Sequence, residues 1–157
     1  MVSVSQRLQE LDIELPNVPA PVAAYVPAKT DRGAGKVRTS GQLPSTNGKL
    51  VASGKVEPGE AATAAGYARV SALNALAAAA QAAGGVDNLT GVEHLTVFVA
   101  SAPGFTEQHV VANGASELYG EIFGEAAAHT RSAVGVAVLP LDAPVEVEAV
   151  FTVRAQA

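Results

Sequence analysis

Two charged residues in the last third of the chain are the strongest candidates for chemistry. Arg131 lies in the polar segment 129–132, and Glu146 lies in the alternating acidic run 145–149. A guanidinium can form a forked pair of hydrogen bonds with a carboxylate, and a carboxylate close to a water molecule can act as a general acid or base. From the residues alone, Arg131 could instead make a surface salt bridge, and Glu146 could be a solvated residue on a strand.

The other residue types that carry chemistry are sparse. His94, His109 and His129 form no i, i+4 pair, and the chain has no cysteine. We therefore expect no metal site, no thiolate chemistry and no disulfide. His129 is of interest only because it precedes Arg131 by two residues.

Composition and charge exclude several classes of protein. Ten Lys and Arg against 15 Asp and Glu give a net charge of −5, so the overall field repels phosphate backbones and nucleic acid is not an expected partner. The start of the chain lacks the features of a secretory signal, and no stretch is apolar and long enough to span a membrane. We expect a soluble, cytoplasmic protein. Its low content of charged residues, 16%, suggests an oligomer.

Periodicity and turn signals predict a short amino-terminal region, 1–20, with a helix and a proline-rich lead-in, followed by one domain, 21–157. Glycine-rich turns, such as the one at 30–35, separate the predicted elements. These elements are strands at 23–28, 36–42 and about 50–56, a helix at 58–83, a strand at 92–99, a helix at 107–123, and strands at 134–138 and 145–151.

This order predicts an α+β fold in which a single mixed sheet has two helices packed on one face. The longer helix should bury a face that includes Val70, Leu73, Ala77 and Ala80. The last two strands are expected to be antiparallel. Because no element is left to cover the other face of the sheet, we expect neighbouring subunits to cover it.

The carboxy-terminal motif is specific enough to suggest a family. Arg131-Ser132 enters a strand, Leu139-Pro140 follows it, and Val-Glu-Val-Glu-Ala stands at 145–149. Upstream, Ser-Gly-Gln-Leu-Pro stands at 40–44. Over residues 20–153 the chain resembles the Rid/YjgF family, the reactive intermediate deaminases, which include UK114-like proteins.

The resemblance implies a chorismate-mutase-like fold and a homotrimer with a central barrel. Three clefts between subunits would bind small acids. Characterised deaminases of this family hydrolyse 2-imino or enamine acids to 2-keto acids and ammonia, and they need no cofactor. The expected partners are therefore further copies of the chain and a small 2-imino or 2-keto acid.

Matched position by position, the resemblance also implies roles for individual residues. Arg131 matches the arginine that anchors the substrate carboxylate, Glu146 matches an acidic position that places water, and Tyr25 matches the aromatic residue that closes the cleft. These three are the catalytic candidates. The ligand-binding candidates are Ser40, Gly41, Asn74, Asn113, Ser132 and Ala133.

Some positions depart from the family pattern. Val26 replaces a serine, Ala133 stands where many relatives carry cysteine, and Gly135 stands where many carry glutamate, while the region 101–130 is longer than usual. The alternative function is therefore a non-catalytic trimer of the same fold that binds a small metabolite. A ribonuclease or translation inhibitor, a label often attached to the family, is disfavoured by the acidic net charge.

Overall fold

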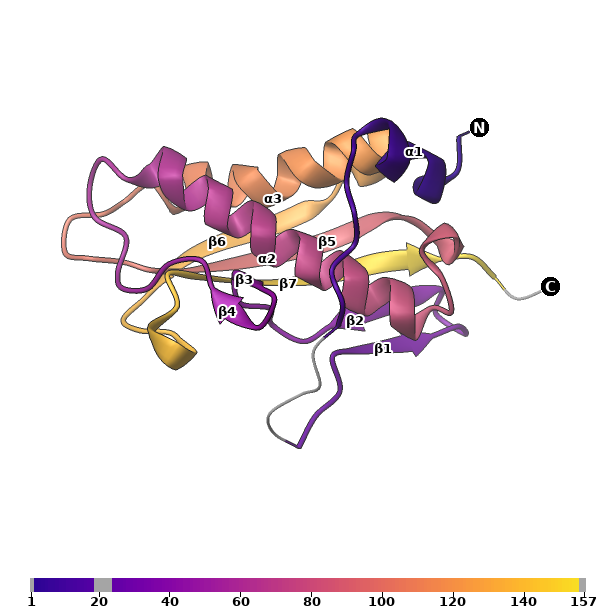
Figure 1. Cartoon of the computed structure of the whole chain (residues 1–157), viewed down its shortest axis with the longest axis horizontal. Helices are drawn as coiled ribbons and strands as arrows, with labels where there is room; N and C mark the ends of the chain where they lie inside the picture. Colours follow the sequence, from indigo (N-terminus) through magenta and orange to yellow (C-terminus); the bar gives the residue numbers. More distant parts are fainter. Residues whose placement is uncertain (1, 19–23, 156–157) are drawn as a thin grey trace.

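The computed structural model describes residues 2–18 and 24–155, and in it two long helices cover one face of a five-stranded sheet (Figure 1). The helices are α1 (Val4–Glu10), α2 (Ala61–Ala82) and α3 (Gln108–Phe123), with short 3₁₀ turns η1 (Val86–Asn88), η2 (Gly124–Ala127) and η3 (Pro140–Asp142). The strands are β1 (Ala28–Asp31), β2 (Lys36–Thr39), β3 (Ser45–Thr46), β4 (Lys49–Leu50), β5 (Leu89–Ala100), β6 (Thr130–Val136) and β7 (Val145–Val153).

The five-stranded sheet is mixed, in the order β1-β2-β7-β5-β6. β5 and β6 pair in parallel, and the other neighbours pair antiparallel. With α2 and α3 on the same face, this arrangement confirms the predicted α+β class with a single mixed sheet. β3 and β4 form a separate two-stranded hairpin.

The two faces of the sheet differ sharply in character. On β7, residues at odd positions such as Val145 and Val147 are buried under the helices, whereas residues at even positions such as Glu146 and Glu148 are only partly buried. The second set points to the face without helices, which we call the open face. This alternation is the normal consequence of the two-residue period of a strand.

The predicted third strand does not join the sheet. Asn47 and Gly48 both adopt positive φ, 53° and 80°, and this conformation closes a tight hairpin between β3 and β4. From the predicted 50–56 strand, only Val56 reaches the sheet, through an isolated bridge to Ser101. The first strand also begins later than predicted, at Ala28, and residues 19–23 lie outside the described part of the chain.

The last two strands are antiparallel, as predicted, but they are not neighbours. β5 lies between β6 and β7 and pairs with both. The connection from β6 to β7 contains Pro140, Pro144 and the turn η3, in which Leu141 has a φ of 59°. A connection of this kind does not make a tight hairpin, so β7 returns on the far side of β5.

The two long helices approach each other at Gly114 on α3. A Cβ atom at this position would lie 1.9 Å from the carbonyl oxygen of Ala65 on α2, so no larger residue fits. Beyond this contact, the Tyr119 hydroxyl donates to the Ala72 carbonyl oxygen (2.7 Å), and its ring packs edge-on against Phe151. The small residues Gly114 and Ala65 therefore allow α2 and α3 to pack closely against each other.

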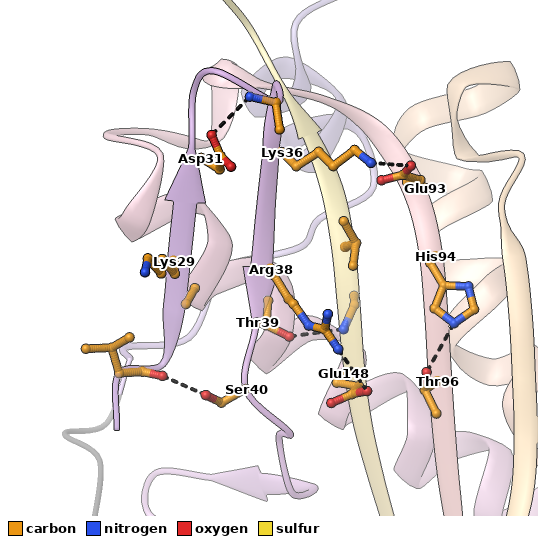
Figure 2. Close-up of a pocket in the computed structure, with 15 residues that line it drawn as sticks. Lys29, Asp31, Lys36, Arg38, Thr39, Ser40, Glu93, His94, Thr96 and Glu148 are labelled. Carbon is orange, nitrogen blue, oxygen red and sulfur yellow. Dashed lines mark hydrogen bonds and ion pairs between the residues drawn. The ribbon is translucent and has the colours of Figure 1, made fainter. Parts of the chain in front are cut away.

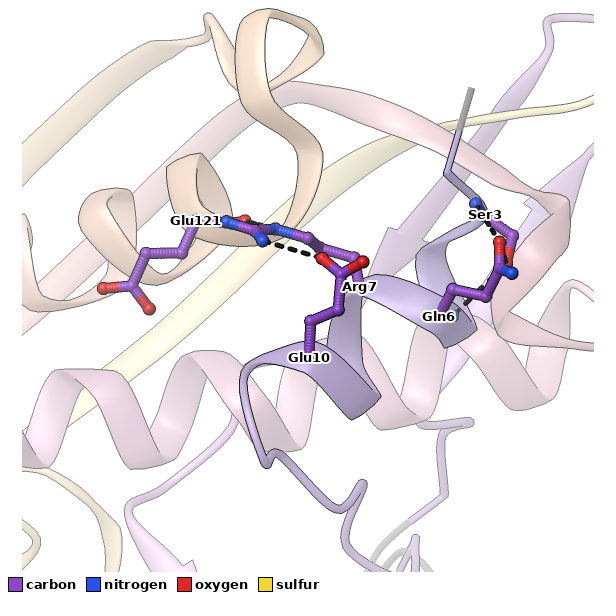
Figure 3. Close-up of polar contacts among 5 residues, drawn as sticks. All are labelled: Ser3, Gln6, Arg7, Glu10 and Glu121. Carbon is purple, nitrogen blue, oxygen red and sulfur yellow. Dashed lines mark hydrogen bonds and ion pairs between the residues drawn. The ribbon is translucent and has the colours of Figure 1, made fainter.

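The amino-terminal helix docks onto the end of this layer. Ser3 and Gln6 form a reciprocal capping box at its start. Arg7 Nε donates to the Glu121 carbonyl oxygen (2.8 Å), and its Nη1 contacts Glu10 (Figure 3). No helix in the described residues is long and apolar enough to cross a membrane.

Candidate functional site

Arg131 lies on the edge strand β6 and points to the helix side, where α3 fixes its guanidinium. Nη1 donates to Asn113 Oδ1 (2.8 Å) and to Ser116 Oγ (3.1 Å), and Nη2 donates to the carbonyl oxygen of His109 (3.2 Å). All three acceptors are neutral. None of the ion pairs within the described residues includes Arg131, so its charge has no acidic partner there.

His129 extends this network behind Ser116. Its Nδ1 lies at the Ala127 carbonyl oxygen, and its Nε2 lies 2.9 Å from Ser116 Oγ. A carbonyl oxygen can only accept, so Nδ1 carries a proton; in the tautomer with its single proton on Nδ1, Nε2 accepts from the Ser116 hydroxyl. The Ser116 oxygen then remains available to accept from Arg131.

Glu146 lies on the open face of β7, directly over Gly41. A Cβ atom at position 41 would lie 2.1 Å from the Glu146 carboxylate oxygen Oε1, so glycine makes room for this side chain. Arg38 pairs with Val150, and Gln42 pairs with Val147. Gln42 is four positions after Arg38, whereas Val147 is only three positions before Val150. One extra residue therefore forms a bulge around Gly41, a device that often re-aims side chains near functional sites.

The environment of Glu146 changes its acidity. Partial burial, together with the negative charge of Glu148 two residues away, raises the pKa of the Glu146 carboxyl above its ordinary value. A carboxyl group shifted towards neutral pH exchanges protons more readily under physiological conditions. This behaviour suits a general acid or base.

Ser40, next to Gly41 in the chain, is bonded to the segment that carries Tyr25. The Ser40 hydroxyl donates to the Val26 carbonyl oxygen (2.6 Å), and its backbone N–H donates to the Pro27 carbonyl oxygen (2.8 Å). These bonds tie the segment that carries Tyr25 to the end of β2. The Tyr25 side chain is 48% exposed.

The structure does not bring Arg131 and Glu146 together within one chain. Arg131 pairs with Leu95 and faces the helices, whereas Glu146 pairs with Phe98 and faces the open side. β5 lies between their strands. The sheet therefore separates two half-sites: an arginine half-site of Arg131, Asn113, Ser116 and His129, and a carboxylate half-site of Glu146, Gly41, Ser40 and Tyr25.

The remaining sequence candidates fall in different places. Ala133 follows Arg131 on the helix side of β6, whereas Ser132 is exposed on the opposite face. Asn74 belongs to neither half-site: its side chain on α2 is buried, and Nδ2 donates to the carbonyl oxygens of Leu43 (3.1 Å) and Ser45 (2.9 Å). Its amide holds the loop that leads into the β3–β4 hairpin.

A hollow of about 870 Å³ occupies the open face beside β1, β2 and β7 (Figure 2). Ser40 lies at its border, but neither Arg131 nor Glu146 lines it. Lys36 pairs with Glu93 (2.8 Å), and Arg38 lies at the limit of contact with Glu148 (4.0 Å). No cluster of three or more His, Asp or Glu side chains suited to a metal ion occurs in residues 2–18 and 24–155.

Two polar residues of the arginine half-site were not among the sequence candidates. These residues are Ser116 and His129, and the sequence marks His129 only by its closeness to Arg131. The signal that could have found Ser116 is the helical spacing of His109, Asn113 and Ser116, at intervals of four and three residues. This spacing places all three on one side of α3, and the structure turns that side towards β6.

A family comparison matches almost the whole chain. Residues 5–152 match the model described as "YjgF/chorismate mutase-like, putative endoribonuclease". The chain belongs to the YjgF/chorismate mutase-like family. The resemblance seen in the sequence motifs is therefore confirmed, and the fold agrees with solved YjgF structures.

Individual proteins are similar to this chain over most of its length. Protein TCP17 of Trypanosoma cruzi is 44% identical over 93% of this chain and 91% of its own length. Atu1372 of Agrobacterium tumefaciens, a solved structure of unknown function, is 39% identical, with a TM-score of 0.84 over 96% of this chain and 92% of its own. E. coli TdcF, solved with bound serine, is 27% identical, with a TM-score of 0.61 over 86% and 92% of the two chains.

Proposed function

We propose that the protein is a cytoplasmic deaminase that hydrolyses reactive 2-imino or enamine acids to 2-keto acids and ammonia in clefts between the subunits of a homotrimer. The observation that carries the proposal is the arginine half-site. Its guanidinium is held in place by neutral acceptors and lacks an acidic partner among the described residues.

A small carboxylate is the ligand that best fits such a guanidinium. A partly buried positive charge loses hydration, and a carboxylate restores the charge balance with two parallel hydrogen bonds. Lysine could not make the same planar contact. The bound serine in TdcF, a molecule that carries a carboxylate, supports this choice of ligand class.

Glu146 supplies the proton transfers in the proposed reaction. Water attacks the imine carbon C2 while a proton passes from the water to the carboxylate. The carboxyl returns this proton to the imine nitrogen, which gives a carbinolamine. A second proton then passes from the carbinolamine hydroxyl through Glu146 to the nitrogen, so the C2–N bond breaks, ammonia leaves and C2 keeps the oxygen as the 2-keto acid. A raised pKa helps the same group to perform both steps near neutral pH.

Because Arg131 and Glu146 lie on opposite faces of the sheet, the proposed site needs two copies of the chain. One copy contributes the arginine half-site and the next contributes the carboxylate half-site. In this arrangement Tyr25 closes the cleft, and the backbone around Ser40 and Gly41 lines it. Three such contacts close a ring with three-fold symmetry.

A second candidate function is a trimer that binds a small carboxylate without transforming it. The observation that favours it is the Ser40 hydroxyl, whose proton is already committed to the Val26 carbonyl oxygen. Ala133 and Gly135 add no reactive group beside Arg131. Nucleic acid cleavage fits less well, because the net charge of −5 opposes binding of an extended phosphate backbone.

The test of the proposal is a coupled assay in which an amino-acid oxidase generates 2-imino acids in the presence of the purified protein. Arg131→Lys should weaken 2-keto acid binding by about 10- to 100-fold, because charge remains but the fork is lost. Glu146→Gln should lower turnover by roughly 10²- to 10⁴-fold and leave binding nearly unchanged.

The two variants also separate the two candidate functions. If the parent protein binds 2-keto acids but does not accelerate imine hydrolysis, and Glu146→Gln changes nothing, the protein is a binder. If Arg131→Lys binds 2-keto acids as tightly as the parent, the proposed site is wrong for either function.

A further inference from the structure

The arginine half-site contains more than the residue that would touch the ligand. Arg131 has five N–H donors: one on Nε and two on each terminal nitrogen. Both donors of Nη1 are used, by Asn113 and Ser116, and one donor of Nη2 is used by the His109 carbonyl oxygen. Among the described residues, Nε and one Nη2 donor have no acceptor.

Of the two edges of the guanidinium plane that offer paired donors, only the Nε–Nη2 edge makes no use of Nη1. Nε–H and the neighbouring Nη2–H point in the same direction, so together they match the two oxygens of one carboxylate. The Nη1 side, by contrast, is occupied by α3. The hydrogen-bond partners therefore leave a single edge for a bidentate ligand.

Ser116 can hold Nη1 only if its own proton points elsewhere. A serine hydroxyl has one proton, and in the Nδ1-protonated tautomer of His129 that proton goes to Nε2. The tautomer of His129 is in turn fixed by the contact of Nδ1 with the Ala127 carbonyl oxygen. The order of donors thus runs from Arg131 through Ser116 and His129 to the backbone of η2.

We propose that Ser116 and His129 are positioning residues that fix Arg131 so that its Nε–Nη2 edge, and no other, receives the substrate carboxylate. This inference rests on the proposed function of Arg131 as the carboxylate anchor. Neither residue touches the ligand. They act by keeping Nη1 engaged and by orienting the guanidinium plane.

Arg131, Ser116, His129 and the Ala127 carbonyl oxygen form a series of hydrogen bonds, which we call the relay. Ser116→Ala and His129→Phe each remove one member of the relay. Each should weaken binding of pyruvate, used as the probe, by about 3- to 10-fold, the value of a neutral hydrogen bond. The double variant should be no weaker than the weaker single variant, because both changes break the same relay. In the imine assay, KM should rise by a similar factor while kcat at saturation stays the same.

Two matched variants separate positioning from general damage. His129→Gln keeps an acceptor for the Ser116 hydroxyl and should recover most of the pyruvate affinity. His94→Gln changes a histidine on β5 whose ring contacts Thr130 and Thr96 and none of the residues of the arginine half-site, so its affinity should equal that of the parent. Loss of affinity in His94→Gln equal to that in His129→Phe would overturn the proposal.

Binding of pyruvate at the Nε–Nη2 edge of Arg131 can be measured by NMR of the full-length protein labelled with ¹⁵N-arginine. The Arg131 Nε–H signal, assigned by its absence from Arg131→Lys, should move downfield when pyruvate is added. In Ser116→Ala this shift should be smaller at saturation. An unmoved Nε–H signal in the parent at saturating pyruvate would refute binding at this edge.

The outcomes distinguish this inference from the proposed function. If Arg131→Lys loses pyruvate but Ser116→Ala and His129→Phe bind it as the parent does, Arg131 remains the anchor and the positioning role is wrong. If the parent shows no binding of pyruvate that depends on Arg131, both the anchor and the relay behind it are wrong.

Discussion

Glu146 and Gly41 illustrate how one backbone position can control one carboxyl group. The absence of a side chain at Gly41 lets the Glu146 carboxylate lie over the bulge, where burial and Glu148 raise its pKa. A methyl group at position 41 would displace the carboxylate, since its oxygen is the flexible partner in that contact. The acidity of Glu146 is therefore a property of the pair.

The raised pKa of Glu146 predicts a pH-dependent gain in stability for Glu146→Gln. Below the ordinary value of 4.5 the carboxyl is protonated in both the folded and unfolded states, so the variant and the parent should have the same Tm. As the pH rises through the raised folded value, ionisation destabilises only the parent. At pH 7 the variant should unfold about 1–2 °C higher, a small gain because the group is only partly buried.

Thermal unfolding followed by circular dichroism at pH 4 and pH 7 measures this difference. Glu117→Gln, which changes an exposed carboxylate on α3, is the matched control and should show no such pH-dependent gain. An equal gain for Glu146→Gln at both pH values would mean that ionisation is not its cause.

Among the elements, α3 has two tasks on neighbouring faces. One face packs Gly114 against α2, and the adjacent side presents Asn113 and Ser116 to Arg131. Any shift of the helix away from α2 therefore also moves the acceptors that hold the guanidinium. Packing of the helix layer and geometry of the arginine half-site are coupled through this single helix.

Gly114→Ala should destabilise the protein, because the new Cβ atom would collide with the backbone oxygen of Ala65, which cannot simply rotate away. We expect a loss of about 1–3 kcal/mol in the free energy of unfolding, measured by urea denaturation. Gly120→Ala is the matched control on the same helix, since its Cβ atom would meet nothing within 4 Å. It should stabilise the protein by about 0.4–1 kcal/mol. Equal effects of the two changes would contradict the close helix contact.

The sequence predicted the types of most long elements but not all of their contacts. Turn residues and alternating valines located α2, α3, β5 and β7 to within a few residues. The buried side of α2 was less accurate: Val70 and Leu73 are only partly buried, whereas Ala64, Ala68 and Ala72 are fully buried. Alanine on every side of a helix gives little contrast between its faces, so periodicity cannot select one.

The order of strands in the sheet, and the division of the candidate site between its two faces, were harder to predict from the sequence. Alternation reveals that β6 and β7 are strands, but it does not reveal that β5 separates them. The family motif pointed to Arg131 and Glu146, but the opposite faces that they occupy depend on strand order. Similarly, the link from Ser116 to His129 joins residues 13 positions apart through a helix end that no local pattern describes.

On the scale of the whole molecule, the open face of the sheet is a surface of mixed character. Lys36 and Arg38 pair with Glu93 and Glu148 across its strands, while Val134 is 41% exposed. A face of this kind can meet another copy through both ion pairs and apolar contacts. It fits the expectation that neighbouring subunits complete the fold.

The assembly itself provides a simple test. Light scattering on the purified protein should give three times the chain mass of 15.8 kDa at micromolar concentration. The mass should be the same for Arg131→Lys, because that change leaves the sheet intact. A stable monomer that still hydrolyses imines would contradict the requirement for two copies at each site.

The placement of Arg131 and Glu146 on opposite faces also has a genetic consequence. Any site that uses both residues draws them from different copies, so a chain damaged at one residue still donates an intact half-site to a neighbour. In a cell that makes equal amounts of two such chains, one defective at each residue, about one quarter of the sites in randomly mixed trimers would have both halves intact. Two alleles that are each inactive alone would therefore complement each other, and their heterozygote would keep part of the function.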